Sequence, residues 1–151
     1  MANPLAPHVS RTVKEYAPHG FSVMETSAVV YTVIAGGTDA QSVPLVFADQ
    51  SDIYLESGSI ISCSGFASEA TNYWTFTLVT GPNGLGSTVS LSGNVGGAST
   101  ALAEATDFPL TITDANRIIP KGQCVWLRAT PNHASSAAGV VAARIRFRIK
   151  A

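Results

Sequence analysis

The sequence predicts an all-β domain, a jelly-roll-like antiparallel sandwich of about eight strands that follows an extended N-terminal arm. Short runs rich in β-branched and aromatic residues cover most of the chain after residue 20. Clusters of Gly, Pro, Asn and Ser, such as "GPNGLG" at 81–86, separate these runs. The chain has 151 residues, of which 13% are charged, about half the usual share of roughly 25%. Such a composition indicates one β-rich domain, or a domain whose surface is covered in an assembly.

The first twenty residues differ from the rest. Pro4, Pro7 and Pro18 interrupt any helix, and the apolar residues between them follow no sustained period. We interpret 1–20 as an extended arm and 21–151 as a single sandwich domain. A disordered terminus without a function is the alternative for the arm.

The remaining chain is expected to form short strands, with one helix candidate. The expected strands are 28–35, 43–48, 52–56, 58–67, 72–80, 87–93, 108–113, 123–129 and 139–150. Alternation places Trp74, Phe76 and Leu78 on the core face of their strand, and Val89 and Leu91 on the core face of theirs. The segment 99–106 is the helix candidate, too short for more than a turn or two.

Cys63 and Cys124 both lie in alternating apolar stretches. We expect buried free thiols, with a disulfide as the alternative. Trp74 stands between the two cysteines, an order that raises an immunoglobulin-like sandwich as the alternative fold. That fold would place a Tyr two residues before the second Cys, where this chain has Gly122, so we favour the jelly roll.

The sequence contains no recognisable catalytic or metal-binding motif. The three histidines, at positions 8, 19 and 133, lie next to no candidate nucleophile, and there is no GxSxG elbow. The glycine-rich stretches lack the lysine of a phosphate loop, and no CxxC or Cys/His cluster is present. We expect a protein that is not an enzyme and has no cofactor. Tyr73, with the acidic segment 49–56, is a weak candidate for a ligand site.

Charge is distributed unevenly along the chain. Residues 1–110 carry two cations against nine acids, a net of −7, whereas residues 111–151 carry seven cations against one acid, a net of +6. The whole chain has a net charge of −1, so we expect no nucleic-acid partner. No apolar run has the length of a membrane span, and no signal peptide is evident. We therefore expect synthesis in a cytoplasm and no membrane partner.

The last strand concentrates the positive charge. Arg144, Arg146, Arg148 and Lys150, here called the cation row, alternate with Ile145, Phe147 and Ile149. Alternation directs the three apolar side chains to the core and the cation row to the opposite face. The row is either a solvated face that discourages edge-to-edge aggregation or a surface that pairs with acids. Those acids would belong to residues 1–110 of this chain, to a neighbouring copy or to another partner.

The segment "FPLTITDANRIIPKGQCVWLRATPNHASSAAGVVAARIRFRI" has a recognisable cadence of strands, turns and a small-residue loop. In this it resembles small β-rich structural proteins of tailed bacteriophages, particularly head-decoration (capsid cement) proteins. The resemblance covers about residues 28–150 and implies a jelly roll on the capsid exterior, with the major capsid protein as partner and terminal arms laid over the shell. It also implies a homotrimer, which the weakly charged composition favours too.

The candidate contacts of such an assembly are the cation row and the arm residues Arg11, Lys14 and Tyr16. The alternative function is a receptor- or glycan-binding module of a phage head fibre or tail.

Overall fold

The structure, a computed structural model, describes residues 20–21, 24–64, 66, 72–132 and 137–150. The described residues form nine strands and one short 3-10 turn. They are β1 (Thr26–Ile34), β2 (Gln41–Phe47), β3 (Ile53–Ser62), β4 (Trp74–Gly81), β5 (Val89–Ser90), β6 (Asp107–Leu110), η1 (Asp114–Asn116), β7 (Ile118–Ile119), β8 (Cys124–Pro131) and β9 (Gly139–Ile149). None of these described segments is a helix long and apolar enough to cross a membrane.

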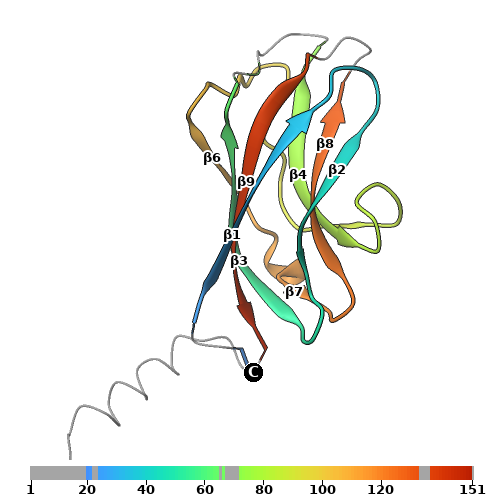
Figure 1. Cartoon of the computed structure of the whole chain (residues 1–151), viewed down its shortest axis with the longest axis vertical. Helices are drawn as coiled ribbons and strands as arrows, with labels where there is room; N and C mark the ends of the chain where they lie inside the picture. The colour runs from blue at the N-terminus through green and yellow to red at the C-terminus, as the bar shows by residue number, and fades with distance from the viewer. Residues whose placement is uncertain (1–19, 22–23, 65, 67–71, 133–136, 151) are drawn as a thin grey trace, which may run out of the picture.

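The strands form two antiparallel sheets that pack face to face (Figure 1). One sheet has the order β1-β9-β3-β6, with β7 paired to the start of β3, and the other has the order β2-β8-β4-β5. The pairs are nested, because β1 pairs with β9, β2 with β8, β3 with β6, and β4 with β5. The chain is therefore a long hairpin wound around one core, which is a jelly roll. An immunoglobulin-like sandwich would pair its first strand with its second, so that alternative is wrong.

The core lies between the two sheets and follows the alternation of the strands. Trp74, Phe76 and Leu78 of β4 are buried, as the sequence predicts. The indole nitrogen of Trp74 donates to the carbonyl of Ala137 at 2.8 Å, so burial leaves no unpaired donor on this ring. Ile145 of β9 faces them from the other sheet and is also buried.

Several predicted element boundaries are corrected by the structure. The predicted strands 52–56 and 58–67 are the single strand β3, which contains an irregularity between Leu55 and Ser57. The helix candidate at 99–106 is not a helix, because Leu102 and Phe66 exchange two main-chain hydrogen bonds of 2.9 Å and form a bridge between turns at either end of the segment. Eight residues cannot sustain a helix against such tertiary pairing.

The two cysteines are not bonded to each other. Cys124 is buried, and this burial raises the pKa of its thiol, so the thiolate form is disfavoured and the group is unreactive. Cys63 is only half-buried. The expectation of free thiols is confirmed, and that of burial holds for Cys124 alone.

Candidate functional site

The cation row lies on the outer face of the five-stranded sheet, and each member pairs with an acid of the same chain. The pairs are Arg144 with Asp107, Arg146 with Glu25, Arg148 with Glu56, and Lys150 with Asp52. The Nζ–Oδ2 distance between Lys150 and Asp52 is 3.3 Å, and the Nε–Oε1 distance between Arg146 and Glu25 is 3.6 Å. All four acids precede residue 110, so the uneven charge along the sequence is compensated within the fold.

An irregularity in β3 positions one of these acids. Opposite β9 the register skips one residue between Leu55 and Ser57, which makes Glu56 the extra residue of a β-bulge. A bulge re-aims the side chain that it carries, and here Glu56 meets Arg148.

Arg117, just after η1, holds the bulge in place. Its Nη1 donates to the carbonyl oxygens of Leu55 and Glu56, at 3.0 and 2.8 Å. Its Nε binds Asp114 at 2.7 Å, and its guanidinium lies 6.0 Å from the centre of the Tyr54 ring. These contacts supply side-chain donors to two main-chain carbonyls at the bulge.

Asp52 anchors the lower end of the row. Its Oδ1 accepts the backbone N–H of Lys121 at 2.9 Å, and its Oδ2 pairs with Lys150. These hydrogen bonds, the one from Lys121 first, lower the pKa of the Asp52 carboxyl. The carboxylate form of Asp52 is therefore favoured by the folded chain.

The four pairs differ in exposure. The side chain of Arg148 is 16% exposed and that of its partner Glu56 is 26% exposed, whereas Arg146 is 51% exposed. An exposed pair contributes at most about 1 kcal/mol, so the pair of Arg148 and Glu56 dominates the energy of the row. Contact between the row and a partner molecule stays a prediction.

The strand β1 presents a second and different surface on the same sheet. Val29, Tyr31 and Val33, here called the apolar row, point outward and are 47%, 72% and 69% exposed. Their register partners on β9 are Arg144, Ala142 and Val140. Val29 therefore lies opposite the first member of the cation row, and Tyr31 and Val33 continue the face beyond that end of the row.

The outward position of the apolar row coincides with an open sheet edge. Among the described strands β1 pairs with β9 alone, through nine consecutive residue pairs without a bulge. The segment 26–34 contains no proline and no charged residue. Lysine, proline and bulges are the usual devices that protect an edge strand from pairing with another chain, and β1 has none of them.

The other edge strands are short or interrupted. On the same side of the sandwich, β2 contains Pro44 and a register shift between Pro44 and Val46. On the far side, β6 has four residues, including Pro109, and β5 has two. A bridge between Ser92 and Ile112 also links the segments that follow β5 and β6 there. Of the described edges, β1 is the long and regular one.

Part of the outer face of the four-stranded sheet is covered by the chain itself. The turn-rich segment 82–88 folds over β8, where the Arg128 Nε donates to the Gly84 carbonyl at 2.8 Å and the Trp126 indole donates to the Gly81 carbonyl at 3.0 Å. A Cβ atom at Gly84 would come within 2.3 Å of the Ser42 side chain. Glycine is therefore required for this close approach.

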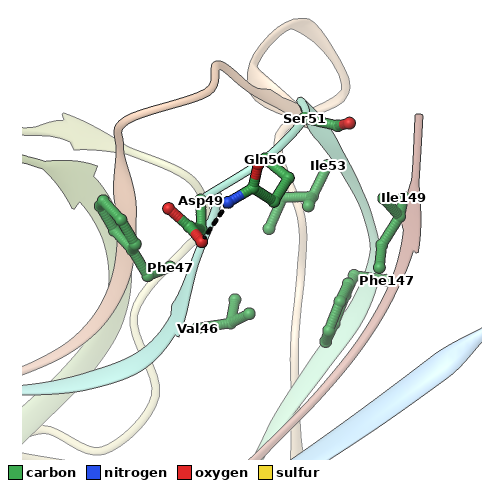
Figure 2. A pocket seen from close by; sticks show the side chains of 8 residues that line it. All are labelled: Val46, Phe47, Asp49, Gln50, Ser51, Ile53, Phe147 and Ile149. Carbon is green, nitrogen blue, oxygen red and sulfur yellow. Dashed lines mark hydrogen bonds between the residues drawn. The ribbon is translucent and has the colours of Figure 1, made fainter. Parts of the chain in front are cut away.

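A hollow of about 240 Å³ opens at the lower end of the sandwich, between the ends of β2 and β9 (Figure 2). It is lined by Val46, Phe47, Asp49, Gln50, Ser51, Ile53, Phe147 and Ile149. Gln50 donates to Asp49 at 2.7 Å, so these two polar side chains satisfy each other. The hollow thus offers mainly apolar walls, with few polar groups to orient a ligand.

Three sequence predictions about individual residues are corrected by these placements. Ile149 lies on the core side of β9 but is 45% exposed at the hollow, and Val89 is 51% exposed. Tyr73 and the segment 49–56 are not brought together. Tyr73 precedes Trp74, which is opposite Pro131 of β8, whereas Phe47 is opposite Cys124 at the other end of that strand. The proposed combination of Tyr73 with acids 49–56 is therefore wrong.

The arm residues Arg11, Lys14 and Tyr16 lie outside the described residues, so their contacts stay predictions. Sequence reasoning missed the apolar row and Arg117. The run "AVVYTVI" at 28–34 is apolar on nearly every position, which is the pattern of a strand covered on both faces, so the apolar row had a readable signal. The role of Arg117 depends on a bulge that no sequence pattern announced.

Comparison with models of protein families and with curated proteins finds no match. Among solved structures, the chain is similar to the family 11 carbohydrate-binding module from Clostridium thermocellum, determined with a β-1,3-1,4-mixed-linked tetrasaccharide. The identity is 13%, the match covers 90% of this chain and 92% of that chain, and the TM-score is 0.27. A likeness of this degree carries no argument about function.

Proposed function

We propose that this chain is a non-enzymatic structural protein of a tailed-phage virion that binds the outside of the capsid and stabilises the shell. The observation that carries the proposal is the open β1 edge with its exposed apolar row, which marks the chain as one that assembles with other protein. The contact with the shell itself is assigned to the arm residues Arg11, Lys14 and Tyr16. A long, uncharged and unprotected edge strand favours contact with protein, because it offers main-chain hydrogen bonds and apolar area together. The resemblance of residues 28–150 to decoration proteins is the reason for proposing a phage capsid as the assembly.

The physics of such a role is simple. A protein that binds the closed shell and not the opened one stabilises the closed shell by mass action. Several copies held together would bind with a high effective concentration, so each contact could be weak. The internally paired cation row suits this role, since it leaves a rigid sandwich with little net charge.

The alternative, a receptor- or glycan-binding module, has no specific observation in its favour. Its proposed site combined Tyr73 with the acids at 49–56, which lie toward opposite ends of β4 and β8. A glycan array tests it directly, and we expect no sugar to be bound.

The test of the main proposal is cosedimentation of the purified chain with heads of the phage that encodes it, prepared without the protein. We expect saturable binding and a higher temperature of DNA release. A variant with Arg11→Glu, Lys14→Glu and Tyr16→Ala should fold normally and bind more weakly, because the arm is predicted to contact the shell. Heads that neither bind the chain nor gain heat resistance would contradict the proposal.

A further inference from the structure

We propose that a second copy of this chain pairs with the β1 edge, antiparallel and around a two-fold axis, so that the five-stranded sheets of two copies become continuous. The inference rests on the geometry of β1 and does not depend on the capsid role. It concerns the residues of β1 (Thr26–Ile34) and the apolar row that this strand carries.

The main chain of β1 is prepared for such pairing. An edge strand turns the N–H and C=O groups of every second residue away from its neighbour, in the plane of the sheet. Nine residues in unbroken register with β9 keep these groups in one straight line. An antiparallel partner of equal length would make about one hydrogen bond per residue with them.

The side chains of β1 are compatible with a second copy of themselves. With Val30 or Tyr31 at the two-fold axis, outward residues meet outward residues, as the two-residue period of a strand requires. Tyr31 then faces Val29 or Tyr31 of the other copy, and these aromatic and β-branched pairs are the favourable cross-strand pairs. Because 26–34 carries no charge, two copies bring no like charges together.

The other occupant that the chain could supply is its own first nineteen residues. That segment contains Pro4, Pro7 and Pro18 as well as the charged residues Arg11, Lys14 and Glu15. Each proline removes a donor from a ladder, and the charges would have to lie beside the apolar row. The segment is therefore a poorer match to the edge than β1 itself.

Symmetry makes the pairing self-limiting. Because β2, β5 and β6 are short or interrupted, a described copy offers one long open edge, and a two-fold contact consumes that edge in both copies. Such an isologous contact closes as a dimer and cannot propagate into a fibre. A contact about 30 Å long and about 15–20 Å wide buries on the order of 1,000 Å² in total, near the lower limit of specific interfaces. We therefore expect a reversible dimer in place of the homotrimer that the resemblance and the composition predict.

The test is sedimentation velocity of the full chain over a wide concentration range, with variants at position 31. Tyr31→Lys and Tyr31→Glu each place like charges opposite or diagonal to each other across the axis and should weaken dimerisation by about tenfold or more. An equimolar mixture of the two variants should recover the dimer, because opposite charges then meet. Leu85→Lys is the matched control: Leu85 is 51% exposed on the segment that covers the other sheet, so its substitution should leave dimerisation unchanged. Melting curves verify that every variant is folded.

The outcomes separate the possible occupants. A monomeric wild type, a trimer, or a dimer that is indifferent to both substitutions at position 31 would overturn the proposal. Loss of association in both variants without recovery in the mixture would also overturn it, because the edge would then take a segment other than β1. Two-fold self-pairing is supported only if each variant by itself loses the dimer and the equimolar mixture recovers it.

Discussion

The outer face of the five-stranded sheet has two parts, the cation row of β9 and the apolar row of β1, which differ in how far the rest of the chain pairs with or covers them. The cation row is compensated within the chain, since every member meets an acid of the same sandwich. The apolar row on β1 has no comparable cover from the described residues, and its central side chain, Tyr31, is 72% exposed. The cation row thus stabilises the fold, and the apolar row on β1 is the surface that remains for a partner.

The largest effect should come from reversing the most buried charge of the cation row. Arg148→Glu places a carboxylate against Glu56, with both side chains largely shielded from water. We expect the free energy of unfolding to fall by about 2–3 kcal/mol, because one partly buried charge loses its partner and meets a like charge. Urea denaturation measures this loss.

Arg146→Glu is the matched control for this substitution. Arg146 has the same charge on the same strand, but its side chain is 51% exposed and its contact with Glu25 is the longest of the four, at 3.6 Å. We expect a loss of at most about 1 kcal/mol. Equal losses of unfolding free energy at the two positions would show that the contribution of a pair in the cation row does not depend on its burial.

A smaller effect should appear in the pH dependence of stability that the pair of Asp52 and Lys150, the last pair of the cation row, contributes. The pKa of Asp52 is lowered by the Lys121 backbone hydrogen bond and by Lys150. A lowered folded-state pKa gives stability that is present above the unfolded-state pKa, about 3.9, and is lost as the pH falls through the folded value. Asp52→Asn should therefore melt below wild type at neutral pH, and the gap should close as the pH falls below about 4.

Lys150→Met sharpens this pH comparison. It keeps the backbone hydrogen bond from Lys121, which is the larger cause of the lowered pKa, and removes only the ammonium. The melting temperature of Lys150→Met should fall with decreasing pH as that of wild type does, but by a smaller amount. A gap between wild type and Asp52→Asn that stays constant down to low pH would argue against a lowered pKa at Asp52.

The sheet pattern was predictable from sequence where strands face each other over their whole length. Alternation placed Ile145 and Phe147 on the core side of β9, and both are buried. It also placed Val89 and Ile149 inward. Val89 lies opposite Thr80 at the end of β4, and Ile149 lines the hollow at the end of β9. Alternation tells which way a side chain points, but not whether the opposite sheet reaches it.

The candidate site was predictable only in part, for a related reason. The sequence marked the cation row and the acids of residues 1–110, but the pairing of Glu56 with Arg148 needs a bulge held by Arg117. The importance of β1 depends on the order of strands in the sheet. The run "AVVYTVI" would be buried on both faces in a central strand, and topology makes it an edge.

The central claim is that β1, and not the cation row, is the surface through which this chain meets a partner. The most direct measurement is amide hydrogen exchange of the wild-type chain at low and high protein concentration, followed residue by residue. The account predicts that the amides of β1 that point away from β9, in the plane of the sheet, gain protection at high concentration. The amides of the edge strands β2 and β6 should not change. Exchange in β1 that is independent of concentration, or protection that appears instead around Arg144–Lys150, would contradict it.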